Sequence, residues 1–205
     1  MINPKVLLFA FFGKKPIGIF VSEKLSLKDA VMTYAIVFLI VKLLLVLEII
    51  VFVGLSSFLA GQALVDLLVG MLLLLIGLLV LIPFVFAAEL VFIYLLGALQ
   101  FMIAGFYRKD KGSLNNFNAS FIALASSIKL VVGLFLLVPF VGWFAAVVAL
   151  IYGVVLMYRF IRDRFTLNDA QAAIVVLIPT DLLLAILLVF AGIISTFLIG
   201  TTLLF

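Results

Sequence analysis

The chain has 205 residues, of which 69% are hydrophobic and only 11% are Asp, Glu, Lys or Arg. A soluble domain of this size covers itself with far more charge, so the composition excludes a soluble globular protein and predicts an integral membrane protein. Cysteine and histidine are both absent. Their absence excludes disulfides, thiolate chemistry, metal or haem ligation by these residues, and histidine acid–base catalysis.

The net charge of +4 comes mainly from three clusters of Lys and Arg, at residues 5–28, 108–111 and 159–164. Such clusters flank the cytoplasmic ends of transmembrane helices. The charge therefore predicts membrane orientation, with the lipid bilayer, including anionic lipids, as the partner and no nucleic acid. The basic residues expected at the cytoplasmic headgroups are Lys14, Lys15, Arg108, Lys109, Lys111, Arg159, Arg162 and Arg164.

Residues 1–28 combine lysines with phenylalanines, among them Phe11 and Phe12. This mixture predicts an interfacial segment that lies on the membrane surface, with apolar groups toward the lipid and lysines among the headgroups. Residues 29–205 contain no polar linker long enough to separate two domains. They are therefore predicted to form a single all-α transmembrane bundle.

The apolar runs predict spans at about 30–55, 63–106, 118–138, 142–160 and 172–200. The second run is unusual, because a straight helix over 63–106 would be about 66 Å long, twice the hydrocarbon thickness of a bilayer. Pro83 predicts a break in it. The short apolar sequence from Pro139 to Gly142 predicts a tight hairpin between the third and fourth spans.

Orientation follows from placing all three basic clusters in the cytoplasm, which requires an even number of crossings between each pair. Residues 112–158 hold two spans, but residues 29–107 hold enough apolar sequence for three. We predict five crossings, with the N-terminus cytoplasmic and the C-terminus extracytoplasmic. Residues 63–82 would then form a re-entrant or tilted helix that continues through Pro83. The alternative is six crossings, with one basic cluster outside.

Residues 112–180 resemble the Yip1 domain family of small integral membrane proteins. The resemblance rests on the order of short motifs, namely Gly112–Ser120, Ser126-Ser127, Val138–Trp143, Ile151–Gly153, Thr166–Ala172 and Pro179. At the start of the chain, Asn3-Pro4, Lys15-Pro16 and Phe20 are similar to the amphipathic start of prokaryotic members. The resemblance implies a five-span fold and a non-enzymatic role.

Ionisable residues inside apolar spans are the main candidate functional residues, because burying a charge is costly unless it is paired or hydrated. They are Lys42, Glu48, Glu89, Lys129 and Asp181. We predict that Asp181 pairs with Lys129 or Lys42, and that this pair either serves only as structural glue or has a functional role. Glu48 and Glu89 fall at similar depth, so they either share a proton or cation or face the outer headgroups separately.

Ala145, Ala149 and Gly153 form a small-residue stripe at four-residue spacing, which is typical of close helix packing in membranes. No nucleotide-binding, metalloprotease or serine-hydrolase motif is present, so we expect no enzymatic activity, no metal and no cofactor. The leading hypothesis is a membrane scaffold or adaptor that organises lipids or partner proteins. The alternatives are a small oligomeric channel or transporter and an accessory subunit of a larger membrane complex.

Overall fold

A computed structural model describes residues 7–8, 11–12, 25–59, 64–108, 112–138 and 141–202. Over these ranges the chain contains five long helices and no strand, which confirms the predicted helical bundle. The helices are α3 (Leu27–Leu59), α4 (Leu64–Tyr107), α5 (Leu114–Leu136), α6 (Val141–Phe165) and α7 (Asp169–Thr202).

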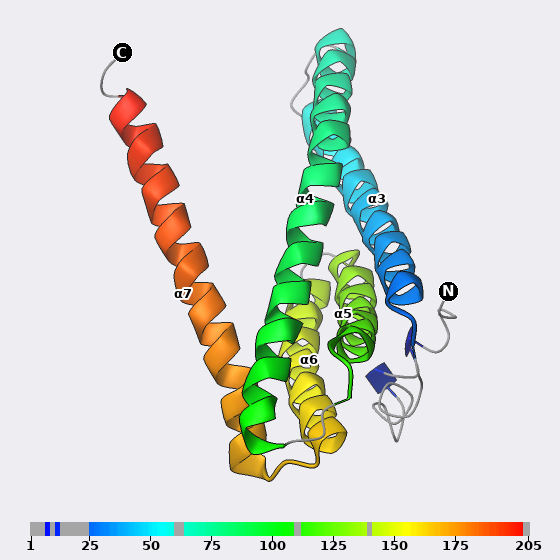
Figure 1. The fold of residues 1–205 in the computed structure, drawn as a ribbon. Coiled ribbons are helices and arrows are strands. Elements are labelled where there is room, and N and C mark those ends of the chain that lie inside the picture. The colour runs from blue at the N-terminus through cyan, green and yellow to red at the C-terminus, as the bar shows by residue number, and fades with distance from the viewer. Residues whose placement is uncertain are drawn as a thin grey trace.

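Helix α5 is the centre of the bundle (Figure 1). It packs against α3, α4 and α6, and its residues from Phe117 to Ile128 are all buried. Small side chains allow this enclosure. A Cβ atom on Gly153 of α6 would lie 2.8 Å from Cγ2 of Ile128, and one on Gly133 of α5 would lie 2.7 Å from Cγ1 of Val41 in α3. Close backbone approach is the usual way in which helices associate in lipid.

Helix α4 is one continuous helix through Pro83, so the predicted break at this proline is absent. Proline is tolerated in transmembrane helices, where neighbouring helices and local adjustments satisfy the freed backbone groups. The N-terminal half of α4 carries many exposed apolar side chains, whereas the half after Pro83 packs against α3, α5 and α7. Within the predicted re-entrant segment 63–82, the described residues 64–82 extend the packed part of α4 and do not form a separate element.

Four helices, α3 to α6, contain segments long and apolar enough to cross a membrane. Helix α4 begins and ends within one residue of its predicted span, whereas α5 begins four residues before its predicted span and α6 ends five residues after its own. The α5–α6 hairpin fits a bilayer best, since these helices are about 34 and 38 Å long. The C-terminal half of α7 diverges from the bundle and leaves a wide separation from α3 and α4 in Figure 1.

Most of the predicted interfacial segment at residues 1–28, including Lys14 and Lys15, lies outside the described residues. The described part includes Leu7 and Phe11, which are almost fully buried. The backbone carbonyl of Leu7 accepts a hydrogen bond from Ser127 of α5, and the Phe11 ring lies 5.2 Å from that of Tyr152 in α6. These N-terminal residues therefore pack against the α5–α6 hairpin.

Candidate functional site

Four polar side chains meet where α3, α4 and α5 come together, and we call them the charged cluster: Tyr34, Lys42, Glu89 and Lys129. The Glu89 carboxylate forms an ion pair with Lys129 and accepts a hydrogen bond from the Tyr34 hydroxyl at 2.7 Å. Lys42 lies 3.8 Å from the second carboxylate oxygen. Lys129 also donates to the Tyr34 hydroxyl at 3.2 Å, so lysine, tyrosine and glutamate form a closed triangle.

Aromatic rings enclose the cations of this cluster. The Lys129 ammonium lies 4.4 Å from the centroid of Phe38 and 5.1 Å from that of Tyr34, and the Lys42 ammonium lies 5.5 Å from Phe38. Tyr34 and Phe38 are fully buried. Cation–π attraction is stronger where water is excluded, so the rings stabilise the lysines at a depth where hydration is poor.

The cluster does not balance its own charge, because two lysines face one glutamate. Lys129 is the more deeply placed lysine, with 18% of its side chain exposed against 31% for Lys42. Lys129 and Tyr34 complete the hydrogen bonding of Glu89, and Lys42 approaches only at ion-pair distance. One positive charge therefore remains on the side of α3.

Two buried amides lie on α4 and α5, which also carry Glu89 and Lys129, and we call them the amide layer: Gln100 of α4 and Asn118 of α5. Asn118 touches Gly97, and eleven residues separate both Glu89 from Gln100 and Lys129 from Asn118. Eleven residues are close to three turns, so the antiparallel pairing brings the amide layer onto the same faces as Glu89 and Lys129. Both amides are fully buried, without a hydrogen bond to another described residue.

We expect Asn118→Leu to leave the free energy of unfolding unchanged or to raise it by about 1 kcal/mol, because a buried amide without a protein partner is destabilising. Leucine nearly matches asparagine in shape. Thermal unfolding in detergent would measure the change, with Ser126→Ala as the control that removes a satisfied polar group. A loss of stability in Asn118→Leu would mean that the amide binds a group outside the protein.

The prediction that Asp181 pairs with Lys129 or Lys42 is wrong, because both lysines are held by Glu89. Asp181 is exposed on α7 and has no hydrogen bond or ion pair to any described residue. Glu48 is half-buried on α3 and also has none in the described part of the chain. Of the two alternatives for these glutamates, a shared proton or cation is not formed, because Glu89 contacts Lys42 and Lys129 and not Glu48.

The C-terminal ends of α4 and α6 and the N-terminal end of α7 meet at one end of the molecule, which we call the basic end (Figure 1). Arg108, just after α4, donates to the backbone carbonyl of Thr166 between α6 and α7 at 2.8 Å. This contact brings two of the three basic clusters together. Lys109 and Lys111 lie outside the described residues. Arg159 is exposed, and Arg164 is half-buried.

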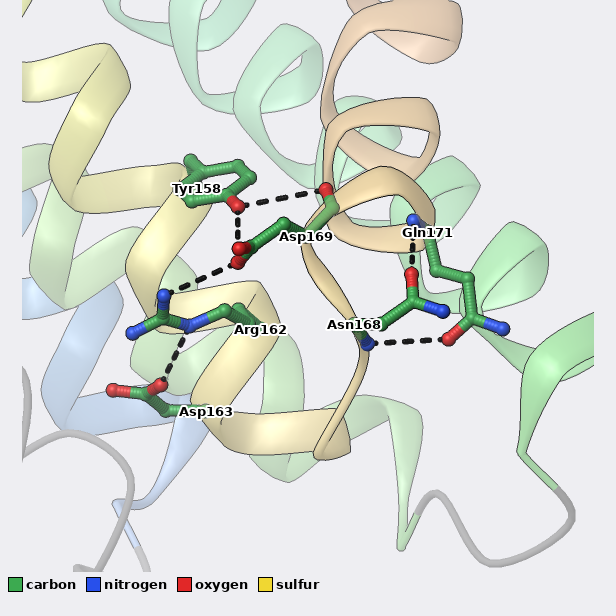
Figure 2. A network of polar contacts seen from close by, with 6 residues as sticks. All are labelled: Tyr158, Arg162, Asp163, Asn168, Asp169 and Gln171. Carbon is green, nitrogen blue, oxygen red and sulfur yellow. Dashed lines mark hydrogen bonds and ion pairs between the residues drawn. The ribbon is translucent and has the colours of Figure 1, made fainter.

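The α6–α7 turn is built from local polar contacts, shown in Figure 2. Asn168 and Gln171 exchange side-chain-to-backbone hydrogen bonds of 2.8 and 3.2 Å, which is a capping box at the start of α7. At the end of α6 the Leu167 amide donates to the Arg162 carbonyl at 3.0 Å, while Thr166 adopts a positive φ of 49°. These contacts form a Schellman turn with threonine at the position usually occupied by glycine.

Asp169 ties the two helices together in Figure 2, because its carboxylate accepts from the Tyr158 hydroxyl at 2.8 Å and from Arg162 at 3.3 Å. Arg162 also contacts Asp163 at 3.2 Å. Tyr158 and then Arg162 favour the ionised carboxylate, so the pKa of Asp169 is held below its ordinary value. The basic end is therefore neutralised in part by its own acidic residues, and Arg159 has no acidic partner among the described residues.

The lowered pKa of Asp169 gives a pH dependence of known sign. Its contribution to stability is present above the ordinary aspartate pKa of about 4 and is lost as pH falls through the lower folded-state pKa. We expect wild type to melt above Asp169→Asn at neutral pH, with the difference disappearing in acid. Melting temperatures of both proteins from about pH 3 to about pH 7, a range that includes the ordinary aspartate pKa of about 4, would test this. A difference in melting temperature that stays constant with pH would contradict it.

The small-residue stripe of α6 serves two surfaces. Gly153 packs against Ile128 of α5, as described above. Ala145 and Ala149 instead line an apolar hollow of about 410 Å³ whose other walls are Phe11, Phe12, Phe135, Val148 and Tyr152. This hollow involves none of the residues of the charged cluster.

Tyr34 and Phe38 were not predicted as site residues. The signal that could have found them is their spacing, because Tyr34, Phe38 and Lys42 recur every four residues and so share one face of α3.

Within the described ranges no group of three acidic, His or Cys side chains is placed to hold a metal. Comparison with protein-family models, curated proteins and solved structures found no match.

Proposed function

We propose that this chain is a non-enzymatic, multi-pass membrane scaffold or adaptor that organises lipids or partner proteins through its basic end. The observation that carries the proposal is the charged cluster, in which the intramembrane lysines and Glu89 contact one another within the protein. A scaffold needs such charges to be satisfied internally, whereas a transporter needs them to face a polar path. The order of motifs that resembles the Yip1 domain family adds support.

The proposal includes five crossings, with α7 as the fifth, a cytoplasmic N-terminus and an extracytoplasmic C-terminus. In its favour, α4 runs unbroken and Arg108 touches the α6–α7 turn, so two basic clusters share one side. The chain has no cysteine, so single cysteines can be introduced without background. Labelling Arg108→Cys and a C-terminal cysteine with an impermeant maleimide from each side of the membrane would test this topology.

Flux and lipid binding test the scaffold role together. In liposomes, the purified protein is expected to give no flux of protons, potassium or sodium above that of empty vesicles. In nanodiscs, anionic lipid is expected to raise its melting temperature. We expect Arg159→Gln to lose much of that stabilisation, because Arg159 is exposed and has no ion pair to the described residues. Arg162→Gln is the matched control, since Arg162 is already occupied by two aspartates. Ion flux that disappears in Glu89→Gln would instead favour a transporter.

A second candidate is an accessory subunit of a larger membrane complex. The observation in its favour is Asp181, a carboxylate exposed on an apolar helix without a partner among the described residues. Purification in a mild detergent would distinguish the two, since a subunit is recovered in a defined ratio with another membrane protein.

A further inference from the structure

Three phenylalanines from three helices meet near the basic end, and we call them the aromatic plug: Phe101 of α4, Phe117 of α5 and Phe165, the last residue of α6. The ring centroids of Phe117 and Phe165 lie 5.3 Å apart. The Phe101 ring lies 5.6 Å from Phe117 and 6.0 Å from Phe165, so each ring packs against the other two. Apolar rings therefore close the three helices against one another at this point.

The amide layer lies directly behind the aromatic plug. Gln100 precedes Phe101 in α4 and Asn118 follows Phe117 in α5, so each amide is one residue farther from the basic end than its neighbouring ring. Gln100 is about 10 Å from the end of α4, and Asn118 is about 6 Å from the start of α5. Water at the basic end is thus close to both amides, but the plug separates it from them.

The closed arrangement is unfavourable for the two amides. The side-chain nitrogen and oxygen of Gln100 and of Asn118 are all buried, without a hydrogen bond to another described residue. A buried polar group without a partner loses its hydration and gains no bond in exchange. Admitting water to the amide layer restores that hydration. The amides therefore favour an open state of this end of the bundle, whereas the aromatic plug favours the closed one.

Arg108 holds the helix ends together beside the plug. It donates to the backbone carbonyl of Thr166 at 2.8 Å, and Thr166 directly follows Phe165, so the contact ties the end of α4 to the end of α6. Thr166 has a positive φ of 49°, which is unfavourable for a β-branched residue. Such strain persists only where surrounding contacts impose it, and it is common at switch regions. The turn that Arg108 contacts is thus strained in the closed state.

We propose that the aromatic plug is a gate that opens to admit water from the basic end to the amide layer, with the Arg108–Thr166 contact as its latch. The gate is one-sided, because Glu89 and Lys129 of the charged cluster lie eleven residues farther along α4 and α5 and keep their ion pair. Opening therefore hydrates the amides without creating a path for ions through the protein. The proposal concerns the packing of this end alone and is independent of the scaffold role.

The reactivity of a single introduced cysteine tests the gate, because the natural chain has no cysteine. Leu96→Cys places a thiol at a buried position of α4, one turn behind Gln100 on the same face. A charged methanethiosulfonate reagent, which does not cross lipid, is added to sealed vesicles of either orientation. We expect the thiol to react at least about tenfold faster from the side of the basic end than from the opposite side, since local opening gives access only there.

Two substitutions are expected to move the gate in opposite directions. Arg108→Gln removes the latch and should raise the reaction rate of Leu96→Cys about fivefold, whereas Asn118→Leu removes the gain from hydration and should lower it about tenfold. Phe101→Leu weakens the plug and is a second variant expected to raise the rate. Ala146→Cys, a buried position of α6 near the α5–α6 turn, is the control whose rate should not respond.

Melting temperatures in detergent would establish that each variant is folded. An unreactive Leu96→Cys, equal reaction from both sides of the membrane, or a rate unaffected by Asn118→Leu would overturn the proposal. So would equal changes in rate at Leu96→Cys and Ala146→Cys, because they would mean that the whole bundle unfolds and no local gate exists.

Discussion

Glu89→Gln is expected to lower the free energy of unfolding by up to about 3 kcal/mol, the lower end of the range found when one partner of a buried ion pair is removed, because 32% of the Glu89 side chain is exposed. The substitution leaves Lys42 and Lys129 close together without a counter-charge. It also exchanges the charged acceptor of the Tyr34 hydroxyl bond for a neutral one. Chemical unfolding in mixed micelles would measure the loss.

Two comparisons make this expectation specific. Glu48→Gln removes the same kind of carboxylate from a half-buried site in the same bundle, but Glu48 has no ion pair to the described residues, so little change is expected. Combining Glu89→Gln with Lys129→Met removes the repelling lysine, so the double variant is expected to recover part of the loss. If Glu89→Gln and Glu48→Gln had equal effects, the charged cluster would have no special role in stability.

The sequence predicted the class of fold because hydrophobic composition and basic clusters depend on the bilayer and not on tertiary detail. Lys129 and Glu89 were both recognised as important for the same reason, since any charge inside an apolar run must be accommodated. The all-helical bundle followed from the lengths of the apolar runs, but the polar start of α5 and the basic end of α6 lie outside those runs and were not included in the predicted spans.

The pairing of the charges could not be predicted, because depth alone does not give the rotation of a helix about its axis. Depth estimated from the basic clusters placed Asp181 with Lys129 near the midplane and Glu89 in the outer half, yet Glu89 is the partner, because it lies on a helix that packs against α5. The register of α4 against α5 decides the pair, and it depends on contacts such as Gly97 against Asn118 and Phe121. The break predicted at Pro83 failed for a related reason, since neighbours can compensate for a missing amide in lipid.

Gly142→Ala is expected to be among the most damaging single substitutions in the chain, because the new methyl group would collide with a backbone atom. A Cβ at Gly142 would overlap the carbonyl oxygen of Phe135 and approach Cβ of Val138 at 2.9 Å. The Gly142 amide also donates to the Val138 carbonyl at 2.9 Å, which fixes the start of α6 close to the end of α5. Overpacking costs about 1–3 kcal/mol, and rigid backbone favours the upper end of that range.

Gly70→Ala and Gly77→Ala are the matched controls, since both glycines are inside α4 and a Cβ at either position meets nothing within 4 Å. Alanine in a helix is favoured over glycine by about 0.5–1 kcal/mol, so both controls are expected to stabilise the protein slightly. Melting temperatures in one detergent would therefore move in opposite directions for Gly142→Ala and the two controls. A neutral Gly142→Ala would mean that the α5–α6 hairpin opens more widely, and the close contact of Gly153 with Ile128 would then be relaxed as well.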